Sequence, residues 1–259
     1  MNKFSILIVL FLMFICVASS LTLVSCEKPS DCIESTGAII TKDVTVQPFK
    51  RIKVYRGIEV IITQGSEYKV EIVAGSHFID NVEVRQNGDQ LIFKDDVSCN
   101  WVRAYGTTKI LVTTPTLEEV YSKTDRNISS NGSLTFPYMS FIAMDEDGDG
   151  EAGAGTGDFI LNVNNDYLNI ANNNVSRFYI SGQTNTANFN FYFGDGRIEA
   201  GDFTVQNMQV YHRGSNDMIV KPIQSITGKM VSTGNIVLRN VPPIVQVEEL
   251  YQGRVIYPQ

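Results

Sequence analysis

Two groups of carboxylates hold most of the chemistry that this sequence offers. In the first group, Asp145, Asp147 and Asp149 alternate with other residues and lead to a glycine. This spacing matches the oxygen ligands that open an EF-hand calcium loop. The twelfth position of such a loop is a bidentate Glu, whereas here it is Thr156. The acidic run therefore supports two interpretations, a free-standing Ca²⁺ site and an exposed, charged loop that holds no cofactor.

The second group consists of Asp195, Arg197, Glu199 and Asp202. Inverting polysaccharide hydrolases place two carboxyl groups about 6.5–9.5 Å apart, so Asp195 and Asp202 support an alternative hypothesis of catalysis. Side chains two residues apart in a strand point the same way, which favours a simple surface ion pair between Arg197 and Glu199. Neither histidine lies near a nucleophile motif, and no phosphate loop or dinucleotide fingerprint occurs. We therefore predict no catalytic residues and no enzyme.

Cys26 offers a different chemistry, because it ends a short apolar leader. Residues 23–26 read LVSC, the form of a bacterial lipobox, in which the peptide is cleaved before the cysteine and its thiol is acylated. The apolar run 4–17 is shorter than the roughly 20 residues of a membrane-spanning helix, as in a signal peptide. We expect residues 1–25 to be a lipoprotein signal peptide and Cys26 to carry the lipid anchor, with palmitate among its acyl chains.

The charge of the chain limits its partners. Removal of residues 1–25, which contain one Lys and no acid, takes the net charge from −7 to −8. Such acidity disfavours nucleic acid, and the missing phosphate-loop motif disfavours nucleotides. We expect the membrane, through the lipid anchor, and a glycan or surface protein as partners. The expected location is the bacterial cell envelope, lipid-anchored at the outer membrane and facing either the periplasm or the cell surface.

Two further cysteines remain once Cys16 of the leader and Cys26 are set aside. Cys32 and Cys99 would lie in a compartment where disulfides persist, and a bridge between them would join the N-terminal segment to the folded body. Pairing does not follow from sequence alone, so a disulfide between Cys32 and Cys99 stays an open alternative.

Strand patterns must position all of these residues. Between residues 44 and 115, short runs of β-branched and aromatic residues alternate with polar ones and are separated by turn residues. Asn87-Gly88 stands between two such runs, which is a strong hairpin signal. We predict that this part of the chain is β-structure with antiparallel pairing.

The second half of the chain has shorter apolar runs and denser Gly, Asn, Asp and Ser. Apolar triplets begin at residues 141, 159, 168, 178, 189, 203, 218 and 236. Evenly spaced short strands without helices indicate a solenoid, a barrel or a sandwich. Asn clusters such as 162–165 and 172–174 favour a β-solenoid, because Asn tolerates left-handed corners and its amides stack between coils. A β-sandwich is the alternative.

Several segments also resemble a known family, the head GIN domain of auto-transporter adhesins. The resemblance covers about residues 44–240 and rests on segments 49–54, 57–65, 112–120, 194–198, 201–203 and 232–238. It implies a right-handed parallel β-helix or a related solenoid on an envelope protein. It brings no catalytic residues with it, and it implies an adhesin-like role.

Together these observations predict an all-β chain with three parts. Residues 1–25 are the signal peptide, 26–43 a tether, and 44–259 a single β-solenoid domain with opening strands to residue 115 and repeat-like coils from residue 116. The expected function is a non-catalytic binding or adhesin-like module. A polysaccharide hydrolase or lyase and a structural component of an envelope complex are the alternatives. Aromatic residues in strands more often belong to the core or to cross-strand pairs, and the alternative is an exposed platform for sugar rings. The candidates for either role are Trp101, Tyr105, Tyr121, Tyr138, Tyr192 and Tyr211.

Overall fold

The computed structural model of the chain describes residues 36–95, 108–145, 148–151, 153 and 155–258. The prediction of an all-β chain is confirmed, because 17 strands in these residues form one sheet. Their regular helical structure is limited to the 3-10 turn η2 (Ile79–Asn81). No helix in these ranges is both long and apolar enough to cross a membrane.

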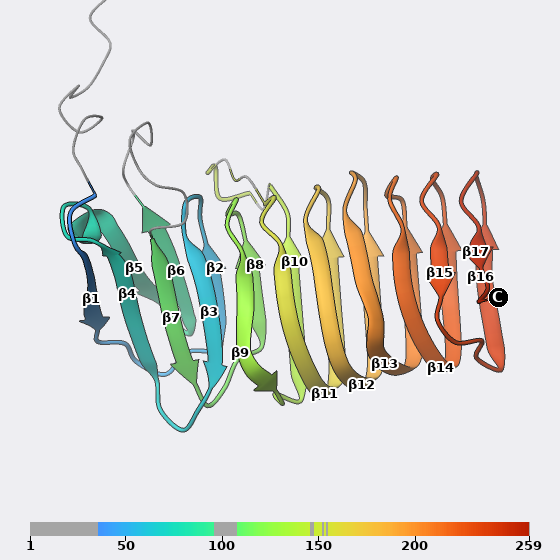
Figure 1. Cartoon of the computed structure of the whole chain (residues 1–259), viewed down its shortest axis with the longest axis horizontal. Coiled ribbons are helices and arrows are strands. Elements are labelled where there is room, and N and C mark those ends of the chain that lie inside the picture. The colour runs from blue at the N-terminus through green and yellow to red at the C-terminus, as the bar shows by residue number, and fades with distance from the viewer. Residues whose placement is uncertain (1–35, 96–107, 146–147, 152, 154, 259) are drawn as a thin grey trace, which may run out of the picture.

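The strands are arrayed side by side along the long axis of the molecule, and the first seven do not follow chain order (Figure 1). They are β1 (Ile39–Val44), β2 (Arg51–Val54), β3 (Glu59–Gln64), β4 (Lys69–Gly75), β5 (Val82–Asn87), β6 (Gln90–Asp95), β7 (Lys109–Thr114), β8 (Glu119–Ser122), β9 (Ile128–Leu134), β10 (Tyr138–Ala143), β11 (Phe159–Asn172), β12 (Arg177–Phe191), β13 (Arg197–His212), β14 (Met218–Met230), β15 (Ile236–Leu238), β16 (Ile244–Glu249) and β17 (Val255–Ile256).

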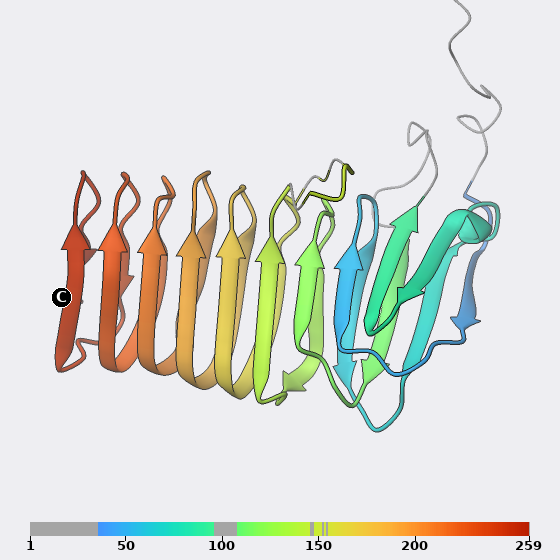
Figure 2. The same ribbon diagram turned by 180° about the vertical axis from the view of Figure 1, so that it is seen from behind.

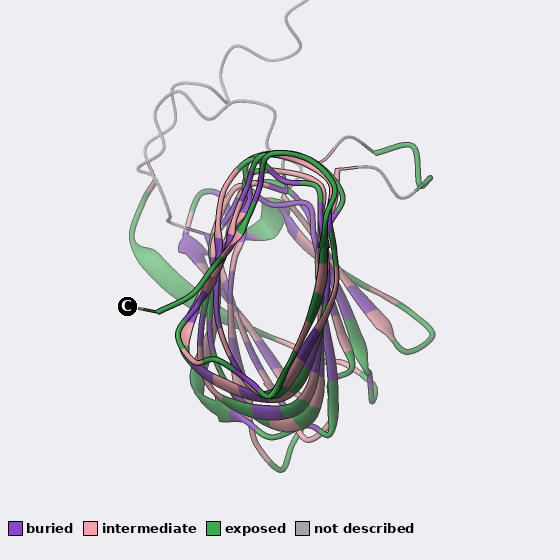
Figure 3. Cartoon of the chain, turned by 90° about the vertical axis from the view of Figure 1, so that its right-hand side faces the viewer, coloured by how far each residue is buried: buried purple, intermediate pink, exposed green. Residues whose placement is uncertain are grey.

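The strand pairs define two faces. Face A runs in the order β5, β6, β2, β8, β10 and ends at β16, and face B runs in the order β1, β4, β7, β3, β9 and ends at β15 and β17. Face B is turned toward the viewer in Figure 1 and face A in Figure 2. Seen along the long axis, the strands enclose an oval (Figure 3).

Strands β11 to β14 bridge the two faces. The first half of β11 pairs in parallel with β9 on face B, and its second half pairs in parallel with β10 on face A. The apolar triplets that begin at Phe159 and Leu168 therefore belong to one bent strand, although the sequence suggested two short ones. The bend does not interrupt the strand, because its corner keeps the pairing, with Asn165 opposite Thr184 of β12.

Alternation of side chains builds the core between the two faces. In β11, Phe159 and Leu161 are buried while Ile160 between them is exposed. Buried aromatic rings also pack from strand to strand: Phe159 stacks on Phe178 with ring centroids 4.5 Å apart. Each fully buried aromatic side chain contributes about 1.5–3 kcal/mol, so the same period-two pattern both fills the interior and leaves every second residue for the surface.

The antiparallel pairing predicted for the N-terminal part of the sheet is confirmed only in part, because β2 and β3 pair in parallel with β6 and β7. Strand β4 pairs antiparallel with β1 and β7, and β5 pairs antiparallel with β6. The hairpin predicted at Asn87-Gly88 is confirmed between β5 and β6, and Gly88 has a φ of 60°, which suits glycine in a tight turn. From β8 onward the ladder on both faces is parallel.

The tether predicted at residues 26–43 overlaps the folded sheet. Strand β1 begins at Ile39 and pairs with β4 from Ile39 opposite Gly75 to Val44 opposite Val70. All but its last residue are exposed, so β1 joins the sheet through its backbone and not through an apolar face. The sequence did not indicate β1, because an exposed strand at the edge of a sheet needs no alternation of apolar residues.

Asparagine and other polar side chains connect neighbouring strands at the corners and on the surface. Asn169 on β11 donates to Ser140 Oγ at 2.8 Å, and Gln183 on β12 donates to Asn164 Oδ1 at 3.0 Å. Gly182 stands at a close approach with a φ of 103°, where a Cβ would lie 2.1 Å from the Val163 carbonyl oxygen. The side-chain amide hydrogen bonds expected from the Asn clusters are therefore present between successive strands.

Candidate functional site

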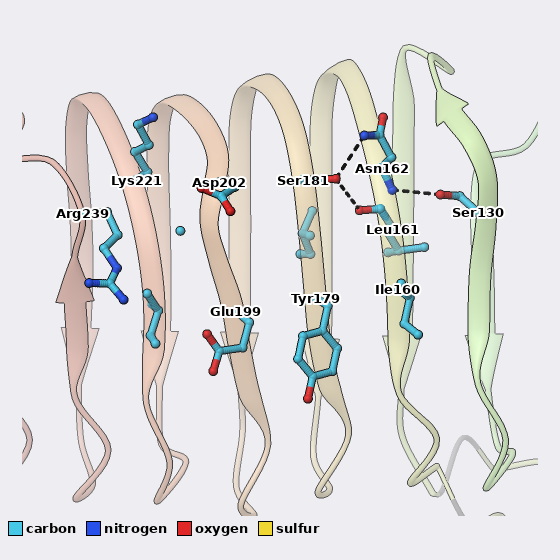
Figure 4. Close-up of a pocket in the computed structure, with 13 residues that line it drawn as sticks. Ser130, Ile160, Leu161, Asn162, Tyr179, Ser181, Glu199, Asp202, Lys221 and Arg239 are labelled. Carbon is cyan, nitrogen blue, oxygen red and sulfur yellow. Dashed lines mark hydrogen bonds between the residues drawn. The ribbon is translucent and has the colours of Figure 1, made fainter.

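A groove of about 730 Å³ crosses face B where β11 to β14 run side by side (Figure 4). It is an open surface hollow between the outward side chains of these strands, with Ser130 of β9 at one end and Arg239, directly after β15, at the other. The lining residues are Ser130, Ile160, Leu161, Asn162, Tyr179, Ile180, Ser181, Glu199, Gly201, Asp202, Ile219, Lys221 and Arg239.

Strand register brings these residues together. Ile160 of β11 lies opposite Tyr179 of β12, which lies opposite Glu199 of β13. Each points outward because its two neighbours in the strand point into the core. Ile160 is 48% exposed and Tyr179 is 38% exposed, so an apolar and an aromatic side chain stand next to a carboxylate on the outside of face B.

The next row of outward side chains, which follows Ile160, Tyr179 and Glu199 along their strands, is polar. Asn162 donates through Nδ2 to Ser181 Oγ at 3.0 Å, and its backbone N–H donates to Ser130 Oγ at 2.8 Å (Figure 4). Asp202 lies opposite Ser181 on the next strand. The groove therefore combines hydroxyl, amide and carboxylate groups, which are the groups that orient a polar ligand.

A bulge in β13 shapes the floor of the groove. Ala200 pairs with Val220 of β14, but the next paired residue of β13 is Thr204, which lies opposite Lys221. The residues in between have no partner on β14, so β13 is locally longer than its neighbour and exposes Asp202. Gly201 also belongs to this bulge.

Arg239 lies at the end of the groove, close to Gly201 of the bulge. The Arg239 backbone N–H donates to the Val220 carbonyl at 2.8 Å, which fixes this residue beside β14. A Cβ on Gly201 would lie 3.4 Å from Arg239 Cγ, 3.5 Å from Arg239 Nε and 3.7 Å from Ile219 Cγ2. These are ordinary contact distances, so Gly201, Ile219 and Arg239 are neighbours in the groove.

The charges of the groove fall into paired and unpaired groups. The Arg197 Nε donates to Glu199 Oε1 at 2.6 Å, so the ion pair predicted between these residues is confirmed. The carboxylate of Glu199 raises the pKa of Arg197. Within the described residues, Asp202, Lys221 and Arg239 have no ion-pair partner, and they face the groove (Figure 4).

The two carboxylates of the catalytic hypothesis do not come together. Asp195 lies in the turn before β13 and accepts hydrogen bonds from Ser215 Oγ at 2.8 Å and from Asn216 Nδ2 at 3.4 Å. Asp202 lies seven residues further along, on the bulge within β13. An extended strand of that length spans on the order of 20 Å, well beyond the separation that a hydrolase needs.

The acidic run contacts the first strands of face A. The carboxylate of Asp149 accepts from Lys123 Nζ at 2.7 Å and also from Lys53 Nζ and Tyr55 Oη. Desolvation by itself would raise the pKa of Asp149, but the hydrogen bonds from Lys123 and Lys53 hold it far below its ordinary range. Glu151 forms a further ion pair with Lys94 at 2.7 Å.

These contacts bear on the calcium hypothesis. Both carboxylate oxygens of Asp149 accept from ammonium groups, and Asp145 Oδ1 accepts from Asn174 Nδ2 at 2.5 Å. Asp147 lies outside the described residues. In those that are described, no three His, Cys, Asp or Glu side chains gather as metal ligands would. A Ca²⁺ site at Asp145, Asp147 and Asp149 stays a prediction.

Other predicted site residues lie outside the described ranges or on face A. Cys26, Cys32, Cys99, Trp101 and Tyr105 are outside the described ranges. On face A, Tyr138 stacks on Tyr167 with centroids 5.2 Å apart, and Tyr192 lies 5.8 Å from Tyr211. Lys53 Nζ lies 5.4 Å from the ring centroid of Tyr121.

Sequence reasoning missed Tyr179, Lys221 and Arg239. Tyr179 carried a usable signal, because it stands between the apolar residues Phe178 and Ile180 and must point outward in a strand. Lys221 and Arg239 carried no such signal, because their place beside Tyr179 depends on the register of four strands and on the bulge in β13.

The sequence model of one protein family matches residues 48–242, which is more than half of the chain. The chain belongs to that family. Its description is "Putative auto-transporter adhesin, head GIN domain", so the resemblance found in the sequence is confirmed. No curated protein matches the chain in sequence.

Solved structures of other bacterial proteins share the fold of this head GIN domain chain. A "putative adhesin" from Bacteroides fragilis has a TM-score of 0.72 at 20% identity, covering 85% of this chain and 97% of its own. A "putative lipid binding protein" from Parabacteroides distasonis has a TM-score of 0.61 at 13% identity, covering 88% and 99%. At such identities these structures show a common fold.

Proposed function

We propose that this chain is a non-catalytic, adhesin-like binding module of the bacterial cell envelope, and that the groove on face B is its binding surface. The observation that carries the proposal is the row of exposed side chains in register there. Ile160 and Tyr179 offer an apolar and an aromatic surface, and unpaired polar groups stand on the adjoining strands. Aromatic and apolar surface with a few oriented polar groups is typical of ligand sites.

The architecture suits such a role. Successive parallel strands, paired in register, support the proposal that residues 116–259 form a β-solenoid, in which each coil rests on the next. Such a stack would hold the groove residues on rigid strands and not on loops, which limits the ordering cost of binding. The family description and the named relatives support adhesion as the class of function.

The lipid anchor completes the proposal. Acylation of Cys26 would hold the module at the outer membrane, facing the periplasm or the cell surface, and residues 27–38 would separate it from the lipid. Replacement of Cys26 by Ala should abolish incorporation of labelled palmitate and release the protein from the membrane fraction. Protease treatment of intact cells would then distinguish surface display from the periplasm.

The binding proposal is tested by adhesion of cells that display the full-length chain to immobilised glycans and host or bacterial surface proteins. Tyr179→Ala combined with Ile160→Ser should remove adhesion, because both exposed contacts of the groove are lost. Tyr192→Ala is the matched control, because Tyr192 is 40% exposed but lies outside the groove. Equal adhesion by wild type, the groove variant and the control would overturn the proposal.

The hydrolase or lyase hypothesis is not favoured by the geometry, because Asp195 lies in the turn before β13 and Asp202 lies on the bulge seven residues further along. Incubation of the full-length chain with acidic and neutral polysaccharides should therefore produce no new reducing ends and no unsaturated products. Activity that is lost in Asp202→Asn would show that the module is an enzyme.

A further inference from the structure

We propose that the groove on face B binds a glycan that carries carboxylates, such as a chain of uronic acids, with Arg239 and Lys221 as the carboxylate partners. This inference rests on the proposed function and names its ligand class. Tyr179 would form the platform for a neighbouring sugar ring, and Asp202 and Ser181 would accept or donate hydrogen bonds to sugar hydroxyls.

The first support is the pair of cations. Lys221 directly follows Val220, and the Arg239 backbone N–H bonds to the Val220 carbonyl, so both residues stand at the same level of adjacent strands. Neither forms an ion pair within the described part of the chain, although the protein carries a net charge of −7. One of the two acids that β13 contributes to the groove, Glu199, is already bound to Arg197.

The second support is the position of Arg239 at the edge of the groove. Arg239 lines the end of the groove beside β14 (Figure 4), and its Cγ and Nε lie near Gly201 of the β13 bulge. A guanidinium presents a planar fork of donors that matches a carboxylate with two parallel hydrogen bonds. Arg239 is exposed, so its fork of donors is accessible to a ligand in the groove.

The third support is the distance to the aromatic platform. Tyr179 is on β12 and Arg239 follows β15, so three strand spacings of about 4.8 Å separate their backbones. Both side chains line the same groove. A short oligosaccharide can span this distance, with one ring on Tyr179 and the carboxylate of another ring at Arg239.

The acidic side chains of the groove disfavour ligands whose negative charges are closely spaced. Asp202 lies in the same hollow as Lys221 and would repel a polyphosphate backbone, whereas it can accept hydrogen bonds from sugar hydroxyls. A ligand with separated carboxylates and many hydroxyls satisfies both kinds of group. The mixture of signs therefore points to an acidic glycan and not to nucleic acid or a phosphate-rich surface.

The test measures binding of an oligogalacturonate, its methyl ester and a neutral glucan to the full-length, detergent-solubilised protein by calorimetry. The wild type should prefer the free acid to the ester by at least about tenfold, and the preference should weaken with salt. Arg239→Met and Lys221→Met should each reduce the affinity for the acid by about tenfold and leave the affinity for the ester unchanged. Lys229→Met is the matched control, because Lys229 lines a separate hollow on face A.

Two further variants distinguish the positioning of Arg239 from the role of Tyr179 as the platform for a sugar ring. Gly201→Val should displace Arg239 and remove the preference for the acid while the far-ultraviolet circular dichroism stays native. Tyr179→Ala should weaken acid and ester alike. Equal affinity of wild type for acid and ester, or no effect of Arg239→Met, would overturn the inference and leave the proposed function intact. Adhesion that depends on Tyr179 but is accompanied by no glycan binding would also overturn the inference and leave the proposed function intact. If the chain shows neither adhesion that depends on Tyr179 nor glycan binding, the proposed function is overturned as well.

Discussion

The ion pair between Asp149 and Lys123 should be the most sensitive electrostatic contact of the molecule. The Lys123 side chain is completely buried, and its ammonium donates to Asp149 Oδ1 at 2.7 Å and to the Glu151 carbonyl at 2.8 Å. Gly153 packs directly over it, since a Cβ there would lie 2.7 Å from Lys123 Cβ. Asp149→Asn keeps the shape of the turn but removes the charge that balances this buried ammonium.

The expected cost follows from this burial. Removal of one partner of a fully buried ion pair destabilises a protein by about 3–5 kcal/mol. The Asp149 side chain is 24% exposed, so water can partly replace the lost carboxylate, and we expect about 2–3 kcal/mol for Asp149→Asn. Lys123→Met with Asp149→Asn should recover about 1 kcal/mol or more, because an apolar side chain then fills the buried site.

Urea unfolding followed by far-ultraviolet circular dichroism measures these free energies. Lys42→Met is the control, because the Lys42–Asp80 ion pair is exposed on both sides and should contribute little. The effect of Asp149→Asn should survive added salt better than any effect of the control. A double variant no more stable than Asp149→Asn would refute the reasoning, since it would show that the buried ammonium is not what destabilises the single variant.

The same contact sets a dependence on pH. The folded-state pKa of Asp149 is depressed, so its contribution is present above the unfolded pKa and is lost as the pH falls below roughly 4. The destabilisation caused by Asp149→Asn should therefore shrink as acid protonates the wild-type carboxyl. A difference between the two proteins that stays constant down to pH 2 would contradict this assignment.

Three further outcomes are expected. Gly182→Ala should destabilise the chain by about 1–3 kcal/mol or more, whereas Gly132→Ala, with a φ of 89° but open space around it, should report the backbone strain alone; equal unfolding midpoints would contradict the close approach. Burial lowers the pKa of His212, so stability should fall as the pH drops below about 6.5, and His212→Leu should remove that slope in urea titrations at several pH values. Addition of Ca²⁺ should leave the thermal unfolding midpoint unchanged, because lysines hold both oxygens of Asp149; a calcium-dependent rise that Asp145→Asn removes would establish the metal site instead.

Local patterns were sufficient for much of the fold. The alternation of Phe178, Tyr179 and Ile180 determines which side chains enter the core, because a strand turns successive residues to opposite faces. Asn87-Gly88 indicated a hairpin, and Gly88 has the left-handed φ that the turn after Asn87 requires. The absence of helical periodicity correctly excluded helical architectures. Strand β1 escaped prediction because its exposed residues show no such pattern.

Contacts between distant segments were decided by the tertiary structure. Asp149 contacts Lys53 and Lys123 because the segment after β10 returns to β2 and β8. The sequence of the acidic run does not indicate which cations it contacts. The groove likewise depends on a bulge that places Gly201 beside Arg239. A sequence pattern reports which way a side chain points relative to its own strand. Which side chains share a surface depends on strand register, and register is set by packing across the whole sheet.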